Sequence, residues 1–188
     1  MNKTQQRIDK INESIICAGF GGQGIMVLGK VLANAAMEKG FFVTWLPAYG
    51  AEVRGGTAYS MVRVSETAIA SPVVKKATTL IVMNEPSLDK FENSLVNKGL
   101  LIVNTSLAKR KTTRKDIEVV SADLTAEAVN LGNIRVANMI SAGVFIAKKN
   151  IFDKNTLISV IKDMAAGRES LIDVNIKALE KGMEIGGG

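Results

Sequence analysis

The sequence contains no histidine and a single cysteine, Cys17, among its 188 residues. Without histidine, the chain lacks the commonest general base and the usual partner of serine and cysteine nucleophiles. One cysteine excludes a disulfide within the chain, and it cannot hold an iron–sulfur cluster, which needs about four thiolates. Cys17 lies in an apolar run, so we expect a buried core residue and not a nucleophile. This cysteine usage favours a reducing, cytoplasmic location.

Long hydrophobic runs and aromatic residues are also scarce. No segment approaches the ~18 consecutive apolar residues of a membrane span, and the polar N-terminus lacks the apolar core of a signal peptide. Aromatic residues make up 5% of the chain. Residues 109–115 are rich in Lys and Arg but contain no aromatic side chain on which a base could stack. We therefore interpret them as a solvated loop, and we expect neither a nucleic acid nor a membrane as partner.

The remaining composition is that of an ordinary globular protein, with 47% hydrophobic and 22% charged residues. The net charge of +6 is modest and favours acidic partners without choosing among them. The length suits one domain with a substantial core. We place that domain at residues 15–185, after an N-terminal arm or short helix over residues 1–14.

Apolar runs alternate with helical patterns along the chain. Strands are expected at 14–18, 41–46, 57–65, 79–83, 100–103 and 117–120, and helices at 22–39, 86–99, 123–129, 135–148, 153–165 and 169–183. This order predicts a single three-layer, Rossmann-like α/β domain with a mainly parallel sheet and helices on both faces. Pro47 should stop the second strand, Gly99 should end the second helix, and residues 68–70 should form a hairpin with 57–65.

The segment 135–148 has almost no polar side, which is typical of a helix buried on more than one face. It could be the central core helix or part of a subunit interface, and Asn138 within it would need a hydrogen-bond partner. Residues 104–106, Asn-Thr-Ser, follow a buried strand and are expected to cap a helix or to bind a ligand.

A glycine loop joins the first strand to the first helix. Gly19, Gly21 and Gly24 have the G-x-G-x-x-G spacing of many nucleotide-binding domains, with Gly22 and Gln23 between them. A dinucleotide site usually has a carboxylate at the end of the second strand, but residues 43–47 contain none. Three interpretations stay open: a bound dinucleotide, a turn that allows close helix–strand packing, and a helix N-terminus that meets a phosphate or a partner's backbone.

A second glycine cluster should lie at the same edge of the sheet. Its notable residues are Tyr49, Glu52, Arg54, Gly55 and Gly56. It could be a surface loop with a local ion pair, worth under ~1 kcal/mol if exposed. Alternatively it is a docking loop, in which Arg54 makes a forked contact with a carboxylate or phosphate and the glycines admit a neighbouring chain.

Both loops, in this order and spacing, resemble the gamma subunit, or gamma domain, of the 2-oxoacid:ferredoxin oxidoreductases. The resemblance covers about residues 15–147, and the pairing of G-F-G-G-Q-G with Y-G-x-E-x-R-G-G is its most specific part. Further matching segments are Ser71–Val74, Met83–Phe91, Asn104–Leu107 and Leu131–Met139. Residues 45–47 and 86–91 look most like the 2-ketoisovalerate members, although Ala51 stands where the family often has proline.

The resemblance implies a component of a thiamine-diphosphate-dependent enzyme that oxidatively decarboxylates a 2-oxoacid to an acyl-CoA and passes electrons to ferredoxin. Thiamine diphosphate and the 4Fe-4S clusters are expected on the alpha, beta and delta-type partner subunits, with CoA as a cosubstrate of the complex. We assign no catalytic residue and no metal ligand to this chain, and expect it to be inactive alone, where it could form a homodimer. Members specific for 2-oxoglutarate or pyruvate, and a free-standing nucleotide-binding protein, are the alternatives.

Overall fold

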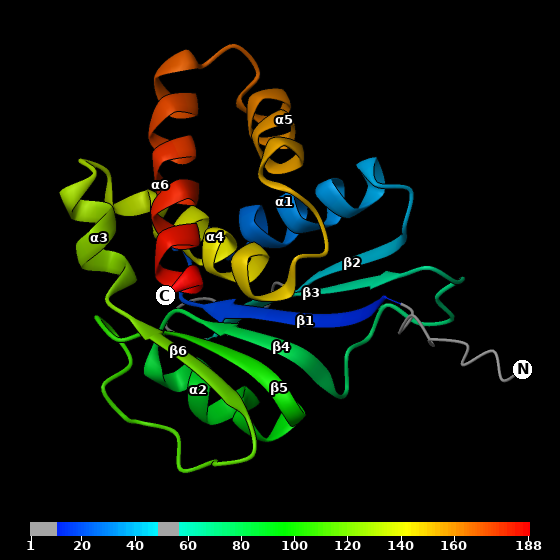
Figure 1. The fold of residues 1–188 in the computed structure, drawn as a ribbon. Coiled ribbons are helices and arrows are strands. Elements are labelled where there is room, and N and C mark those ends of the chain that lie inside the picture. The colour runs from blue at the N-terminus through cyan, green and yellow to red at the C-terminus, as the bar shows by residue number, and fades with distance from the viewer. Residues whose placement is uncertain (1–10, 49–56) are drawn as a thin grey trace, which may run out of the picture.

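Strands and helices alternate in the computed structural model, which describes residues 11–48 and 57–188 (Figure 1). The strands are β1 (Asn12–Gly19), β2 (Phe42–Ala48), β3 (Ala58–Ser65), β4 (Ala77–Val82), β5 (Leu95–Asn104) and β6 (Glu118–Ala122). The helices are α1 (Ile25–Glu38), α2 (Glu85–Phe91), α3 (Leu124–Asn130), α4 (Ala137–Lys149), α5 (Lys154–Ala165) and α6 (Glu169–Gly187). Short 3-10 helices occupy Glu92–Ser94 and Ile134–Val136. β1 starts within the predicted arm, whose first ten residues lie outside the described ones.

The strands form one mixed sheet in the order β2-β3-β1-β4-β5-β6. Neighbours from β1 to β6 run parallel, whereas β3 is antiparallel to both β2 and β1. The expected mainly parallel α/β sheet is therefore confirmed. The predicted hairpin between 57–65 and 68–70 is wrong, because β2 and β1 already take both edges of β3 and residues 68–70 form no strand.

Two predicted boundaries are also wrong. β2 continues through Pro47, which pairs in register with Ser60. Since β2 is an edge strand, a residue without an N–H is tolerated there. Gly99 does not end a helix: α2 stops at Phe91, and Gly99 lies within β5. A Cβ at Gly99 would come within 2.8 Å of the Val96 carbonyl oxygen, so a local close approach and not a helix end explains this glycine.

The two faces of the sheet are covered unequally. Helices α1, α4, α5 and α6 lie over one face, while α2 lies on the other, beside β4 (Figure 1). Side chains of β1 alternate accordingly: Ile15 and Cys17 join the larger core, and Ile16 and Ala18 join the smaller one. Helices on both faces are thus confirmed. Cys17 is fully buried as predicted, and burial raises the pKa of its thiol.

Helix α4 is the central helix of the larger core. All residues from Ala137 to Ile146 are buried within this chain, so the core interpretation accounts for its apolar character without a subunit interface. Helix α6 packs closely against it, because Gly143 and Gly182 bring the two backbones together. A Cβ on Gly182 would overlap the carbonyl oxygen of Ile140.

The basic segment is held by neighbouring carboxylates. Arg110 pairs with Asp89 at 2.9 Å and with Glu92 at 3.0 Å, and Arg114 pairs with Asp116. These contacts fasten residues 109–115 to α2 and the turn that follows it, and they compensate part of the positive charge. None of the helices in the described part of the chain has the length and hydrophobicity needed to cross a membrane.

Candidate functional site

The first glycine loop lies at the carboxyl end of β1. Gly19 is the last residue of that strand, and α1 begins at Ile25. Gly22 has φ +90° and Gly24 has φ +72°, a backbone region that disfavours residues with a Cβ. These glycines are therefore explained locally by the turn from strand to helix, which takes only five residues, 20–24.

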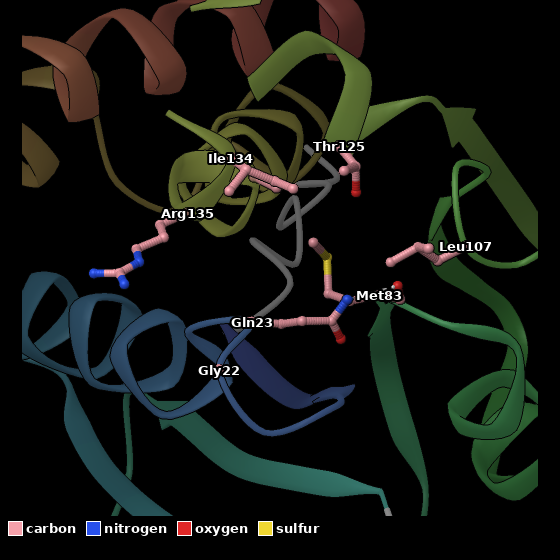
Figure 2. A pocket seen from close by; sticks show the side chains of 8 residues that line it. Gly22, Gln23, Met83, Leu107, Thr125, Ile134 and Arg135 are labelled. Atoms are coloured by element: carbon pink, nitrogen blue, oxygen red, sulfur yellow. Dashed lines mark hydrogen bonds between the residues drawn. The ribbon is translucent and has the colours of Figure 1, made fainter. Parts of the chain in front are cut away.

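The side chain of Gln23 forms the hydrogen bonds that hold the glycine loop. Its amide oxygen Oε1 accepts hydrogen bonds from the Phe20 N–H at 2.6 Å and from Asn84 Nδ2 at 3.3 Å. Its Nε2 donates to the Met83 carbonyl at 3.3 Å, and Figure 2 shows the side chain directed towards Met83. The Phe20 N–H is thus hydrogen-bonded within the chain and is not available to a ligand.

Buried amides extend this arrangement across the ends of three parallel strands. Asn84 follows β4, is fully buried, and accepts from the Ser87 N–H as the cap of α2. Asn104 ends β5 and donates to the Met83 carbonyl at 3.3 Å and to Thr125 Oγ1 at 2.8 Å. The Asn104 oxygen accepts from the N–H of Ser106 and Thr125, which confirms capping for residues 104–106.

Gly24 meets the central helix directly. Asn138 on α4 donates from Nδ2 to the Gly24 carbonyl at 3.1 Å, which is the partner that this buried side chain requires. A Cβ on Gly24 would overlap the same amide group. Close packing between the loop and α4 therefore accounts for Gly24, and it supports the packing interpretation of the glycine motif.

The cavity beside this loop is small. It has a volume of about 150 Å³ and is lined by Gly22, Gln23, Met83, Leu107, Thr125, Ile134, Arg135 and Ala137. Sites for drug-sized ligands occupy about 300–1,000 Å³, so the cavity formed by the described residues is smaller than such a site. Ile134 and Leu107 remain 59% and 44% exposed at its rim. The Arg135 side chain points away from the other lining residues (Figure 2).

The second loop lies outside the described residues, so the predictions for Tyr49, Glu52, Arg54, Gly55 and Gly56 remain untested. Its flanking strands, however, place its two ends. Ala58 pairs with Gly19, and Ala48 pairs with Tyr59, so β2 ends and β3 begins beside the first glycine loop. The expectation that both loops leave from one edge of the sheet is confirmed for these described ends.

A family comparison matches nearly the whole domain. The sequence model described as pyruvate ferredoxin/flavodoxin oxidoreductase matches residues 14–185. The chain belongs to this oxidoreductase family. It is 34% identical over 168 residues to the ketoisovalerate oxidoreductase subunit VorA of Methanothermobacter thermautotrophicus, a match that covers 89% of this chain and 35% of VorA. This chain therefore spans about a third of that relative's length.

A second relative of the oxidoreductase family matches from end to end. The 2-oxoglutarate synthase subunit KorC of Methanocaldococcus jannaschii is 30% identical over 191 residues, covering 98% of both chains. Among solved structures, a keto/oxoacid ferredoxin oxidoreductase gamma subunit from Geobacter sulfurreducens has a TM-score of 0.80 at 24% identity, covering 93% of this chain and 98% of that one. The 2-oxoglutarate:ferredoxin oxidoreductase of Magnetococcus marinus has a TM-score of 0.84 at 21% identity, covering 93% and 31%. These likenesses confirm the predicted fold.

The donor groups of this family member do not fit an iron–sulfur cluster. The sequence supplies one cysteine and no histidine, and Cys17 is buried beneath the sheet's helical layer. Among the described residues, no three Asp, Glu or Cys side chains gather where they could hold a metal ion.

Proposed function

We propose that this chain is the gamma subunit of a cytoplasmic 2-oxoacid:ferredoxin oxidoreductase, of the 2-ketoisovalerate type. The family match over residues 14–185 supports the class of enzyme, and the likeness to VorA supports the branched-chain substrate. The end-to-end likeness to KorC makes 2-oxoglutarate the alternative substrate, with pyruvate the next. VorA is about three times as long as the segment matched here, so its additional activities belong to other chains in this proposal.

The observation that supports a structural role for this chain is that its glycine loop is held by hydrogen bonds within the chain. Gln23 forms hydrogen bonds with the Phe20 N–H and the Met83 carbonyl, the adjacent cavity formed by the described residues is small, and exposed Leu107 and Ile134 lie at its rim. Exposed apolar side chains around a rigid edge suit contact with protein. In the complex, this edge and Arg54 would hold the partner subunits that bear thiamine diphosphate and the 4Fe-4S clusters.

The test is recovery of the complex through this chain. A tagged copy expressed in its native host should bring down alpha, beta and delta-type subunits. The purified complex should then reduce a dye in a CoA-dependent reaction, fastest with 2-ketoisovalerate among several 2-oxoacids. The isolated chain should show no turnover. Turnover by the chain alone, or its recovery without any partner subunit, would contradict the proposal.

A further inference from the structure

Within the described residues, the sheet face on the α2 side has little helical cover over β2, and over β3 beyond Tyr59, which Phe91 of α2 contacts (Figure 1). Register defines the side chains that share this face, because residues paired across antiparallel strands point to the same side. One row contains Leu46, Met61 and Ile16, and the next contains Thr44, Arg63 and Ser14. A polar row with a cation at its centre thus follows an apolar row.

Arg63 uses only part of its hydrogen-bonding capacity within the described residues. Its Nη1 donates to the Ser71 carbonyl at 3.1 Å. Its Nε is buried and has no hydrogen-bond partner there, and the same holds for Thr44 Oγ1, which belongs to the residue opposite in register. Buried polar atoms are normally paired, so two unpaired atoms on residues opposite in register require an explanation.

A hollow of about 400 Å³ opens at this place. It is lined by Ser14, Arg63, Ser71, Val73, Val74, Lys75 and Lys76. Lys75 and Lys76 are exposed, and the three cations of the hollow form no ion pair with any described carboxylate. Arg110 and Arg114 elsewhere in the chain are both paired with carboxylates, so the hollow is a local excess of positive charge.

Apolar side chains flank these cations. Val73, which lines the hollow, is 45% exposed, and Phe42, on the same sheet face two residues before Thr44, is 53% exposed. A free inorganic anion would use only the cations, whereas a polypeptide could cover the apolar flanks as well. The combination therefore favours a protein ligand that carries carboxylates.

We infer that the surface formed by Phe42, Arg63, Val73, Lys75 and Lys76, the Arg63 surface, docks an acidic segment of a partner subunit. A carboxylate in the hollow would pair with the Arg63 guanidinium, with the two lysines adding charge. This surface is separate from the glycine-loop edge, since Arg63 lies five residues along β3 from Ala58, about 16 Å at ~3.3 Å per residue. The inference rests on the proposed function only for the existence of partner chains.

Lysine reactivity in the intact complex tests this surface. Acetylation read by mass spectrometry should show that Lys75 and Lys76 react at least fivefold more slowly in the complex than in the isolated chain. Lys162, exposed on α5 over the other face, is the internal reference. Carbodiimide, which joins an amine to a touching carboxylate, should link Lys75 or Lys76 to an Asp or Glu of another subunit.

Charge reversal gives a second measurement. Lys75→Glu with Lys76→Glu, both exposed, should leave the fold intact and weaken partner affinity at least tenfold, and Arg63→Lys should weaken it by removing the guanidinium fork. Lys162→Glu with Lys177→Glu makes the same change in net charge on exposed helical positions and should leave affinity unchanged.

Three results distinguish failure of the Arg63 surface from failure of the proposed function. Equal lysine reactivity with and without partners, together with unchanged affinity of the Lys75/Lys76 variant, overturns the Arg63 surface while the proposed function stands. Protection of these lysines in the isolated chain by inorganic phosphate, without protection in the complex, overturns it in favour of a small-anion site. Failure of the unaltered chain to bind any partner subunit overturns the proposed function itself.

Discussion

Gly24 is held in a left-handed conformation and touches Asn138, and these are two separate reasons for glycine at one position. Its neighbour Gln23 supplies the hydrogen bonds that hold the loop. The sequence motif predicts where such a loop lies, but it does not reveal that the loop is filled by its own glutamine. That arrangement depends on Asn84 and Met83, which are about 60 residues away in the chain.

Replacement of Gly24 by alanine separates backbone strain from crowding. Gly24→Ala should lower the free energy of unfolding by at least about 2 kcal/mol, because the new Cβ meets both an unfavourable φ and Asn138. Gly40→Ala is the matched control, since Gly40 has φ +79° with nothing within 4 Å of its Cβ position. The control should cost about 1 kcal/mol in urea unfolding. Equal losses in the two variants would show that the contact with Asn138 is unimportant.

At the scale of elements, the contact between α4 and α6 depends on glycine. Gly182→Ala should destabilise the protein by at least about 2 kcal/mol, because the added methyl meets the backbone of Ile140, which cannot rotate away as a side chain can. Gly187→Ala on the same helix has open space and should be neutral or slightly stabilising. Thermal unfolding of both variants measures the difference, and similar melting temperatures would contradict close packing at Gly182.

The start of α5 should depend on pH through Asp153. This carboxylate caps the helix by accepting from the Thr156 N–H and pairs with Lys39 at 2.6 Å. The hydrogen bond from Lys39, followed by those from Thr156, lowers the pKa of Asp153. A lowered folded-state pKa contributes stability above the unfolded pKa of about 3.9 and loses it as pH falls towards the folded value.

Asp153→Asn should therefore be less stable than the unaltered chain at pH 7, and the difference should shrink below pH 4. Urea unfolding at several pH values measures it. Asp173→Asn, at an exposed position without an ion pair among the described residues, is the control and should show little difference at any pH. A difference for Asp153→Asn that stays constant down to pH 2 would contradict the role assigned to the carboxylate.

Sequence periodicity located the strands because buried runs such as Leu100–Val103 leave little alternative. It did not locate β3 in the sheet, because an alternating pattern reports which side chains are buried and not which strands lie alongside. Pro47 led to a wrong strand boundary because the position of its strand in the sheet was unknown. A missing N–H removes a hydrogen bond in a central strand, whereas it is tolerated in an edge strand such as β2. The sequence predicted the first glycine loop at the end of β1. It did not predict the hydrogen bond from Asn84 to Gln23, or those from Gln23 and Asn104 to the Met83 carbonyl.

At the scale of the whole molecule, the property that tests the proposed function is the association of this chain with partner subunits. Arg54→Ala should reduce recovery of the partner subunits and dye-reducing activity together, because the forked contact proposed for the second loop is lost. Arg168→Ala, at an exposed position between α5 and α6, is the matched control and should retain both. Undiminished recovery and activity in the Arg54 variant would count against docking through that loop.

The complete burial of Cys17 has a practical consequence for chemical labelling. Since it is the only thiol of the chain and is fully buried, a maleimide reagent should leave the native protein unmodified and label it only as it unfolds globally. The rate of this labelling would then report opening of the central sheet without any mutation. A cysteine introduced at a surface position would accept a fluorophore selectively, so that distances within the assembled enzyme become measurable from this subunit.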